Sequence, residues 1–270
     1  MKTIMFLFVM LIVSNGLFAQ YTSSSAQHEG QMTLPKHGAL LDGKTIVKVN
    51  LLGMPLRNFS FYGERIITKR MSAVLGANTM SSGQLPFIKH FTDDPGLLNM
   101  QVGSTSYSPE IRFYLGKNGY GQGFYIAPYY KFEKFNITSL AVNVKYAIGE
   151  FPGFAPFDDT LHIKGDFATH GFGALIGVQW LMGKKKNIVL DWTILGAHYG
   201  FNKATAEGHF DSAPEILIKD AVDQINRELI DELGDYITIN KLEADGKKVF
   251  LDANSLWTMI RMSLSIGFRF

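Results

Sequence analysis

The sequence contains no cysteine, and this absence removes several classes of protein at once. Without thiols there is no disulfide framework, no thiolate nucleophile, no cysteine-ligated zinc and no lipid-modified N-terminal cysteine. An excess of charge of one sign is also lacking, because the formal net charge is +2. That value is too small to favour nucleic acid as a partner. We therefore expect no nucleic-acid partner, no metal site and no cofactor.

After residue 19 the chain has no apolar run long enough for a membrane-spanning helix. The one long run, Ile4–Val13, follows Lys2 and precedes a polar stretch that ends at Ala19, which is the pattern of an export signal. We predict a signal peptide over residues 1–19, since the run is short for a retained anchor. Residues 20–44 are polar and aperiodic and predict a flexible periplasmic leader. An exported chain without disulfides needs another stabiliser, and a closed ladder of strand hydrogen bonds supplies one.

What the chain does contain is a two-residue alternation, seen most clearly in the last fifteen residues, Leu256–Phe270. Large apolar residues there occupy every second position: Ile260, Met262, Leu264, Ile266, Phe268 and Phe270. The positions between them are polar or small: Arg261, Ser263, Ser265, Gly267 and Arg269. A strand with this pattern has one apolar and one polar face. The pattern is typical of a transmembrane β-barrel, in which lipid-facing and lumen-facing residues alternate.

Seven earlier segments alternate in the same way, so residues 45–270 predict an all-β, eight-stranded antiparallel transmembrane β-barrel. The strands are expected at about 45–54, 56–67, 71–80, 105–115, 124–148, 161–182, 187–200 and 256–270. The short connections, 68–70, 116–123 and 183–186, then share one end, which we assign to the periplasm together with both termini. The long connections 81–104, 149–160 and 201–255 lie outside the cell. The glycines of 116–123 indicate a hairpin rather than a phosphate cradle, because no strand-then-helix context surrounds them.

The longest connection, residues 201–255, predicts a helix before the last strand. Ser212 and Pro214 mark its start, and apolar residues recur at helical spacing as far as Leu233, before Gly234. We predict an amphipathic helix over about 214–233, followed by a short hairpin that turns at Asp245-Gly246. The apolar stripe of the helix either caps the mouth of the barrel, which we favour, or docks a partner or the outer leaflet.

The polar faces of the predicted strands carry charges of both signs. They are Lys48, Glu64, Glu110, Arg112, Lys131, Glu133, Asp191, Arg261 and Arg269. Buried charges must be paired, because an isolated charge costs several kcal/mol in a low-dielectric interior. The charges therefore form either a paired plug that fills the lumen or an ion path or gate. We favour the plug, because side chains nearly fill an eight-stranded interior.

Seven histidines raise the alternative of an enzyme. His162, His170 and His198 fall near the predicted outer rim, where neighbouring Ser or Glu residues could complete a triad. No HExxH or GxSxG motif accompanies them, so we interpret them as rim histidines at the headgroup boundary. The Lys184–Lys186 turn is interpreted as a solvated anchor near anionic headgroups rather than as a site for an acidic partner.

A soluble lipocalin-like barrel is the rival fold, but it would bury the charged face of nearly every strand. The pattern favours a structural or interaction role through extracellular loops. A lipid A-modifying enzyme and a narrow ion channel remain the alternatives.

Together these features resemble the small eight-stranded outer-membrane barrels, such as the transmembrane domain of outer membrane protein A and outer membrane protein X. More narrowly, Lys48–Leu52 and Glu64–Ser72 resemble a family of uncharacterised Gram-negative outer-membrane barrels known only as a domain of unknown function. The resemblance implies outer-membrane lipids as surroundings and an unidentified extracellular partner. It also implies that Phe268 and Phe270 form the signal read by the barrel-assembly machinery. It implies no catalytic, metal-binding or cofactor-binding residue.

Overall fold

The computed structural model describes residues 43–86, 88–90, 92–93, 95–146, 157–215 and 234–270, and residues 218–219, 222–223, 226–227 and 230–231 between the last two ranges. The predicted signal peptide lies outside the described residues, as do all but the last two residues of the predicted leader. The tip of the predicted loop 149–160, up to residue 156, also lies outside them.

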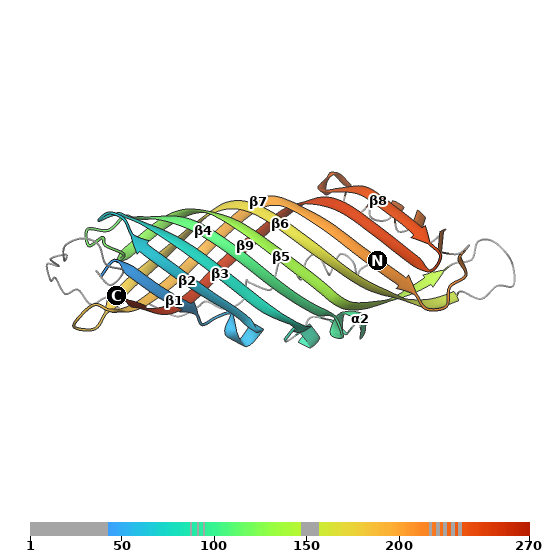
Figure 1. The fold of residues 1–270 in the computed structure, drawn as a ribbon, viewed down its shortest axis with the longest axis horizontal. Helices are drawn as coiled ribbons and strands as arrows, with labels where there is room; N and C mark the ends of the chain where they lie inside the picture. The colour runs from blue at the N-terminus through green and yellow to red at the C-terminus, as the bar shows by residue number, and fades with distance from the viewer. Residues whose placement is uncertain are drawn as a thin grey trace.

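Eight antiparallel strands close into a ring (Figure 1). They are β1 (Thr45–Asn50), β2 (Asn58–Ile66), β3 (Met71–Gln84), β4 (Gln101–Tyr114), β5 (Gly123–Tyr146), β6 (Phe157–Met182), β7 (Ile188–Phe210) and β9 (Lys248–Arg269). Each strand pairs with the next, and β1 pairs with β9 to close the ring. Strand β8 (Ile237–Asp245) pairs with the first part of β9, outside the ring. The predicted all-β ring of eight antiparallel strands is thereby confirmed, and its arrangement is compatible with a β-barrel.

The pairing register sets the tilt of the strands. Cross-strand partners followed once around the ring from Ile46 are Glu64, Val74, Glu110, Tyr129, Gly173, His198 and Met259. Met259 lies ten residues before Arg269, which is the direct partner of Ile46 on β9. Such an offset in an eight-strand ring corresponds to a tilt of about 40°. A ring of this size encloses just enough space for its own inward side chains.

The alternation along each strand determines which side chains point into the interior of the ring, and β4 shows this most clearly. Tyr107, Ile111 and Phe113 are exposed on its outer face, whereas Glu110 and Arg112 are buried on its inner face. The same polarity, apolar outside and polar inside, recurs around the ring. It is the reverse of the arrangement in a soluble barrel.

The C-terminus lies at the end with the short turns (Figure 1). Apolar side chains close the inside of this end. Ile46, Ile66, Leu181 and Val189 form a buried cluster against which Tyr120 packs. The 115–122 turn reaches this cluster because Gly121 adopts a φ of +81°. A Cβ there would lie 3.0 Å from a methyl group of Ile66, so glycine permits the close approach.

The far end is built from strands that are longer than predicted. Strand β7 continues to Phe210 rather than Gly200, and β9 begins at Lys248 rather than Leu256. The connection is therefore residues 211–247, and the expected 201–255 insertion is wrong at both ends. Similarly, β3 extends to Gln84 and β4 begins at Gln101, with a short helix α2 (Pro95–Leu98) between them. The extensions escaped prediction because most of their outward residues are polar, which removes the apolar alternation.

Strand β1 is shorter than predicted and ends at Asn50 rather than Met54. The side chain of Asn50 accepts a hydrogen bond from the Leu52 amide at 3.1 Å, which turns the chain out of the sheet. A 3-10 helix η1 (Met54–Leu56) follows, with Pro55 in its first turn, so β2 begins at Asn58. A second 3-10 turn, η2 (Ile88–His90), precedes α2, and a third, η3 (Gly234–Tyr236), precedes β8.

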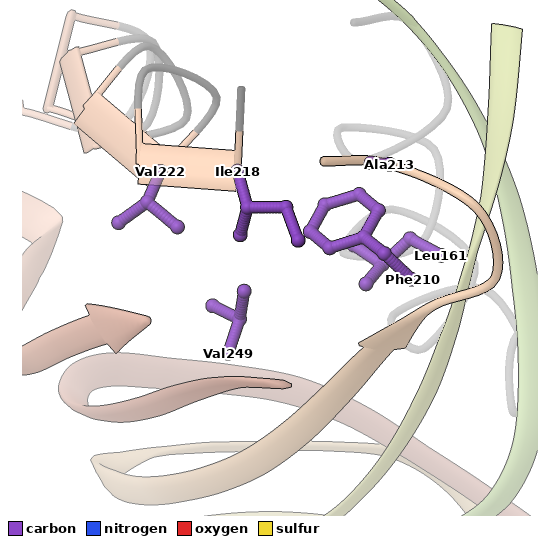
Figure 2. Close-up of a cluster of buried hydrophobic side chains, with 6 residues drawn as sticks. All are labelled: Leu161, Phe210, Ala213, Ile218, Val222 and Val249. Carbon is purple, nitrogen blue, oxygen red and sulfur yellow. The ribbon is translucent and has the colours of Figure 1, made fainter. Parts of the chain in front are cut away.

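A second apolar cluster covers the far end of the ring (Figure 2). It contains Leu161, Phe210, Ala213, Ile218, Val222 and Val249. Ile218 and Val222 come from the segment 214–233, for which the sequence predicts a helix. The helix stays a prediction, because half of that segment lies outside the described residues. Because these side chains pack on the ends of β6, β7 and β9, the described part of the segment contacts its own protein.

Asp159 ties the start of this segment to β6. Its carboxylate accepts hydrogen bonds from the backbone amides of Ala213 at 2.7 Å, Thr160 at 2.8 Å and Ser212 at 3.1 Å. Burial raises the pKa of this carboxyl, but the amide donors and the charge of Lys247 outweigh burial and hold the pKa below its ordinary value. The contact therefore persists at every pH above the ordinary aspartate pKa of about 3.9 and is lost as the pH falls through the lowered value.

Asp159→Ala is expected to release the start of the segment. Hydrogen exchange at the Ser212 and Ala213 amides should accelerate about fivefold or more at neutral pH, since a lost cap costs about 1 kcal/mol. Asp166→Ala is the control, because this carboxylate faces Lys134 rather than the segment. Equal exchange rates in the two variants would refute the anchoring role.

Candidate functional site

The candidate site is a group of six charged side chains inside the ring, five of them buried and Arg261 partly exposed, which we call the charge network. Strands β1, β2, β4, β7 and β9 supply them: Lys48, Glu64, Glu110, Arg112, Asp191 and Arg261. Each occupies an inward position of the alternation, so strand geometry alone points all six toward the axis. The side chains of Lys48 and Glu64 are fully buried, at 0% exposure.

Lys48 lies at the centre of the network. Its ammonium donates to Glu64 Oε2 at 2.7 Å, to Gln179 Oε1 at 2.8 Å and to Asp191 Oδ2 at 2.6 Å. An ammonium has three hydrogens, and here each has an acceptor. Complete pairing of this kind is what offsets the cost of burying a charge.

Arg112 and Arg261 extend the network along the axis. Arg112 Nη1 donates to Asp191 Oδ2 at 2.7 Å, and Arg112 Nη2 donates to Glu110 Oε2 at 3.3 Å. The other oxygen of Glu110 accepts a hydrogen bond from Arg261 Nη2 at 2.6 Å. The network thus contains three cations and three carboxylates, so its formal charge is zero.

Aromatic rings flank both guanidinium groups. The Arg112 guanidinium lies 4.3 Å from the centroid of the Tyr125 ring. That of Arg261 lies 5.5 Å from the Tyr62 ring and 5.2 Å from the Tyr129 ring. Cation–π contacts of this length stabilise a desolvated guanidinium.

Uncharged side chains add further hydrogen bonds to the network, and the sequence analysis did not assign them this role. Tyr114 and Ser72 each donate to Glu64 Oε1 at 2.6 Å, and Tyr125 donates to Asp191 Oδ1 at 2.7 Å. Gln179 bridges Lys48 to the short-turn end by donating to the Gly121 carbonyl at 2.7 Å. Their inward positions were visible in the alternation, but their partners depend on the register between strands.

Three charges predicted for the lumen lie apart from the network. Lys131 and Glu133 form their own ion pair at 2.7 Å on β5. Arg269 is buried at the short-turn end, where its Nε donates to the Gly43 carbonyl. Phe268 and Phe270, the predicted assembly signal, lie on the outer face at the same end with ring centroids 5.1 Å apart.

The three histidines proposed for a triad are not brought together. His198 is buried inside the ring, with Nδ1 at 2.9 Å from the Tyr129 hydroxyl. His170 is exposed on the outer face beside Tyr130, and His162 pairs with Asp211 at 3.2 Å toward the far end. In the described part of the chain, no three His, Asp or Glu residues gather as metal ligands.

Glycines of β6 make room for the large inward side chains. A Cβ on Gly177 would lie 2.4 Å from the Tyr125 hydroxyl oxygen, and one on Gly171 would lie 2.6 Å from the His198 ring. These contacts are shorter than real Cβ contacts, so the wall must lack a side chain at both positions. Gly177 therefore keeps Tyr125 in reach of Asp191.

Gly177→Ala is expected to lower the free energy of unfolding by about 1–3 kcal/mol, because the added methyl group overpacks the interior. Gly63→Ala on β2 is the matched control, since a Cβ there meets nothing within 4 Å. Urea titration of the two variants, followed by tryptophan fluorescence, measures both. Equal midpoints for the two variants would refute the packing role of Gly177.

Comparison with known proteins adds no relative: no family model, no curated protein and no solved structure matches this chain. The resemblance to outer-membrane barrel families therefore stays a prediction. Within the described residues, none of the helices has the length and apolarity needed to cross a membrane.

Proposed function

We propose that this protein is an integral outer-membrane β-barrel of structural or interaction type whose lumen is plugged by the charge network. The observation that carries the proposal is the apolar outer face of the ring. Every ring strand contributes an exposed large apolar side chain, for example Val47, Phe61, Leu75, Ile111, Ile126, Phe172, Leu195 and Ile266. We call this surface the apolar belt. Continuous apolar surface around a whole molecule is rare in soluble monomers and expected of lipid-facing strands.

The apolar belt has a boundary toward the far end. Phe132, His170, Phe201 and Leu256 are successive cross-strand neighbours on β5, β6, β7 and β9. The next outward positions on these strands are Lys134, Ala168, Lys203 and Asn254, which are also neighbours. From Met182 to His170 strand β6 covers about 40 Å, or about 30 Å along the axis at this tilt. That height is close to the apolar band of about 25 Å in outer-membrane barrels.

The interior supports a closed lumen rather than a channel. The charge network fills the section of the ring that lies next to the apolar cluster of Ile46 and Val189, on the side toward the far end. Its cations and carboxylates are matched in number and lie within hydrogen-bond distance of one another. A conducting path would instead need charged groups that face open water.

The far end supports an interaction role. Strands β5, β6, β7 and β9 project beyond the apolar belt, with exposed ion pairs between Lys134 and Asp166 at 3.6 Å and between Lys248 and Glu207 at 2.8 Å. An open cavity of about 680 Å³ lies among these strands and β8. We propose that this end faces out of the cell and carries the contacts to a partner, while the short turns face the periplasm.

Reconstitution of the mature chain tests the proposal. The protein should float with lipid vesicles after a urea wash, and a planar bilayer containing it should show no steady conductance. Recovery of the folded protein in aqueous buffer without detergent would overturn the membrane assignment. Conductance steps from the unmodified protein would overturn the plug and favour the channel.

A further inference from the structure

The three short turns at one end of the ring carry six cationic residues, which we call the basic rim. They are Lys69, Arg70, Lys117, Lys184, Lys185 and Lys186. The turns that hold them, residues 67–70, 115–122 and 183–187, contain no Asp or Glu. Five of the six residues are exposed, and Lys186 is half-buried. The turns therefore place a concentrated positive charge in solvent.

The basic rim differs from the other charged surfaces of the molecule in having no counter-charges. Within the described residues, no carboxylate pairs with any of its six cations. Glu64 and Asp191, the acidic residues closest in sequence to the turns, point into the ring and are saturated by the charge network. At the far end, by contrast, exposed lysines of β5 and β9 are paired. Within the described residues, the three turns thus carry positive charge that no paired carboxylate offsets.

The basic rim begins where the apolar belt ends. Ile67, Leu115 and Met182 are 55%, 59% and 40% exposed on the outer face, and each lies within two residues of a rim cation. Long Lys and Arg side chains at such a boundary lay their stems along apolar surface and place the charge in the headgroup layer. The position of these cations matches a membrane interface.

The turns follow β2, β4 and β6 and so are spaced around the ring. Cations distributed in this way contact many small anions in a layer better than one compact macromolecule. We propose that the basic rim binds the phosphate-containing headgroups of anionic phospholipids in the leaflet around the short-turn end, an inference that rests on the proposed membrane barrel. Each cation near a charged leaflet adds to the attraction, so the six act together.

Tryptophan fluorescence offers a local test. Trp180 is 39% exposed on the outer face three residues from Gly183, and Trp192 is half-buried nearby, whereas Trp257 is buried inside the ring. The full mature chain is reconstituted in phosphatidylcholine vesicles that contain either brominated phosphatidylglycerol or brominated phosphatidylcholine at equal mole fraction. Brominated chains quench the tryptophans they contact. We expect about threefold or greater enrichment of phosphatidylglycerol near the rim, and loss of the enrichment at about 1 M salt, where the Debye length is about 3 Å.

The decisive variant removes the charge from all six rim positions. It combines Lys69→Gln, Arg70→Gln, Lys117→Gln, Lys184→Gln, Lys185→Gln and Lys186→Asn, the last because residue 186 has a φ of +50° that Asn tolerates. The enrichment of phosphatidylglycerol near the rim should fall to about onefold, which means no preference over phosphatidylcholine. The control neutralises six cations of the far end, Lys89, Lys134, Lys164, Lys203, Lys241 and Lys248, and should retain the enrichment. If the rim variant fails to insert, the variant with only the three changes at 184–186 should show about half the enrichment.

The outcomes separate this inference from the proposed function. Equal quenching by the two brominated lipids, with no effect of salt, would refute headgroup binding and leave the barrel intact; the basic rim would then face an acidic macromolecule. Absence of quenching by both lipids would refute the barrel itself and with it the headgroup site.

Discussion

Replacing Lys48 with Met is expected to lower the free energy of unfolding by about 3–5 kcal/mol. Met matches the length of the lysine stem but removes the ammonium that neutralises Glu64 and Asp191 inside the ring. Two buried carboxylates would then lose their shared counter-charge, which is the costly way to break a buried ion pair. Urea titration in lipid vesicles, followed by tryptophan fluorescence, measures the change.

Two comparisons isolate the effect of the pairing. Lys184→Met removes a lysine from the basic rim and, in vesicles of phosphatidylcholine alone, which offer no anionic lipid, should change the unfolding free energy by less than about 0.5 kcal/mol. The double variant Lys48→Met with Asp191→Leu restores a balance of charges and should recover about half of the loss. A Lys48→Met variant as stable as Lys184→Met would show that the network contributes no stability.

Replacing Leu195 with Arg is expected to destabilise the inserted protein by about 2–4 kcal/mol. Leu195 is 48% exposed on the outer face of β7, near the middle of the apolar belt. Thr205→Arg, on the same face of the same strand but beyond the belt, is the matched control and should cost less than about 1 kcal/mol. Both are measured by urea titration in vesicles.

This pair of variants distinguishes a lipid-facing surface from a water-facing one. In water an exposed leucine and an exposed threonine both tolerate arginine, and surface substitutions usually stay within about 0.5 kcal/mol. In hydrocarbon only the belt position carries a large cost. Equal and small effects at Leu195 and Thr205 would therefore contradict the lipid-facing belt.

Alternation along each strand was enough to predict the ring of eight strands and its two faces. The two-residue period is local, so Lys48 and Arg112 could be assigned to the interior from their neighbours alone. The same reasoning missed the parts of β7 and β9 that lie beyond the apolar belt, because outward residues such as Thr205 are polar there. The backbone hydrogen bonds between these strands continue where neither strand has an apolar face. Residue composition alone therefore does not reveal that the strands extend so far.

The partners within the site could not be predicted in the same way. Which acid meets Lys48 depends on the register of strands that are far apart in sequence, such as β1 and β7. It also depends on the offset with which β1 returns to β9. The role of Gly177 likewise appears only when β5 and β6 are paired and Tyr125 needs space. These are properties of the closed sheet rather than of any one segment.

Labelling of single cysteines in intact cells tests the central claim most directly, because the chain has no cysteine of its own. A membrane-impermeant maleimide should label Thr205→Cys in intact cells and Lys185→Cys only after the outer membrane is permeabilised. It should label Phe172→Cys in neither case, although this side chain is 70% exposed on the ring. Ready labelling of Phe172→Cys together with the other two would contradict a membrane-spanning barrel.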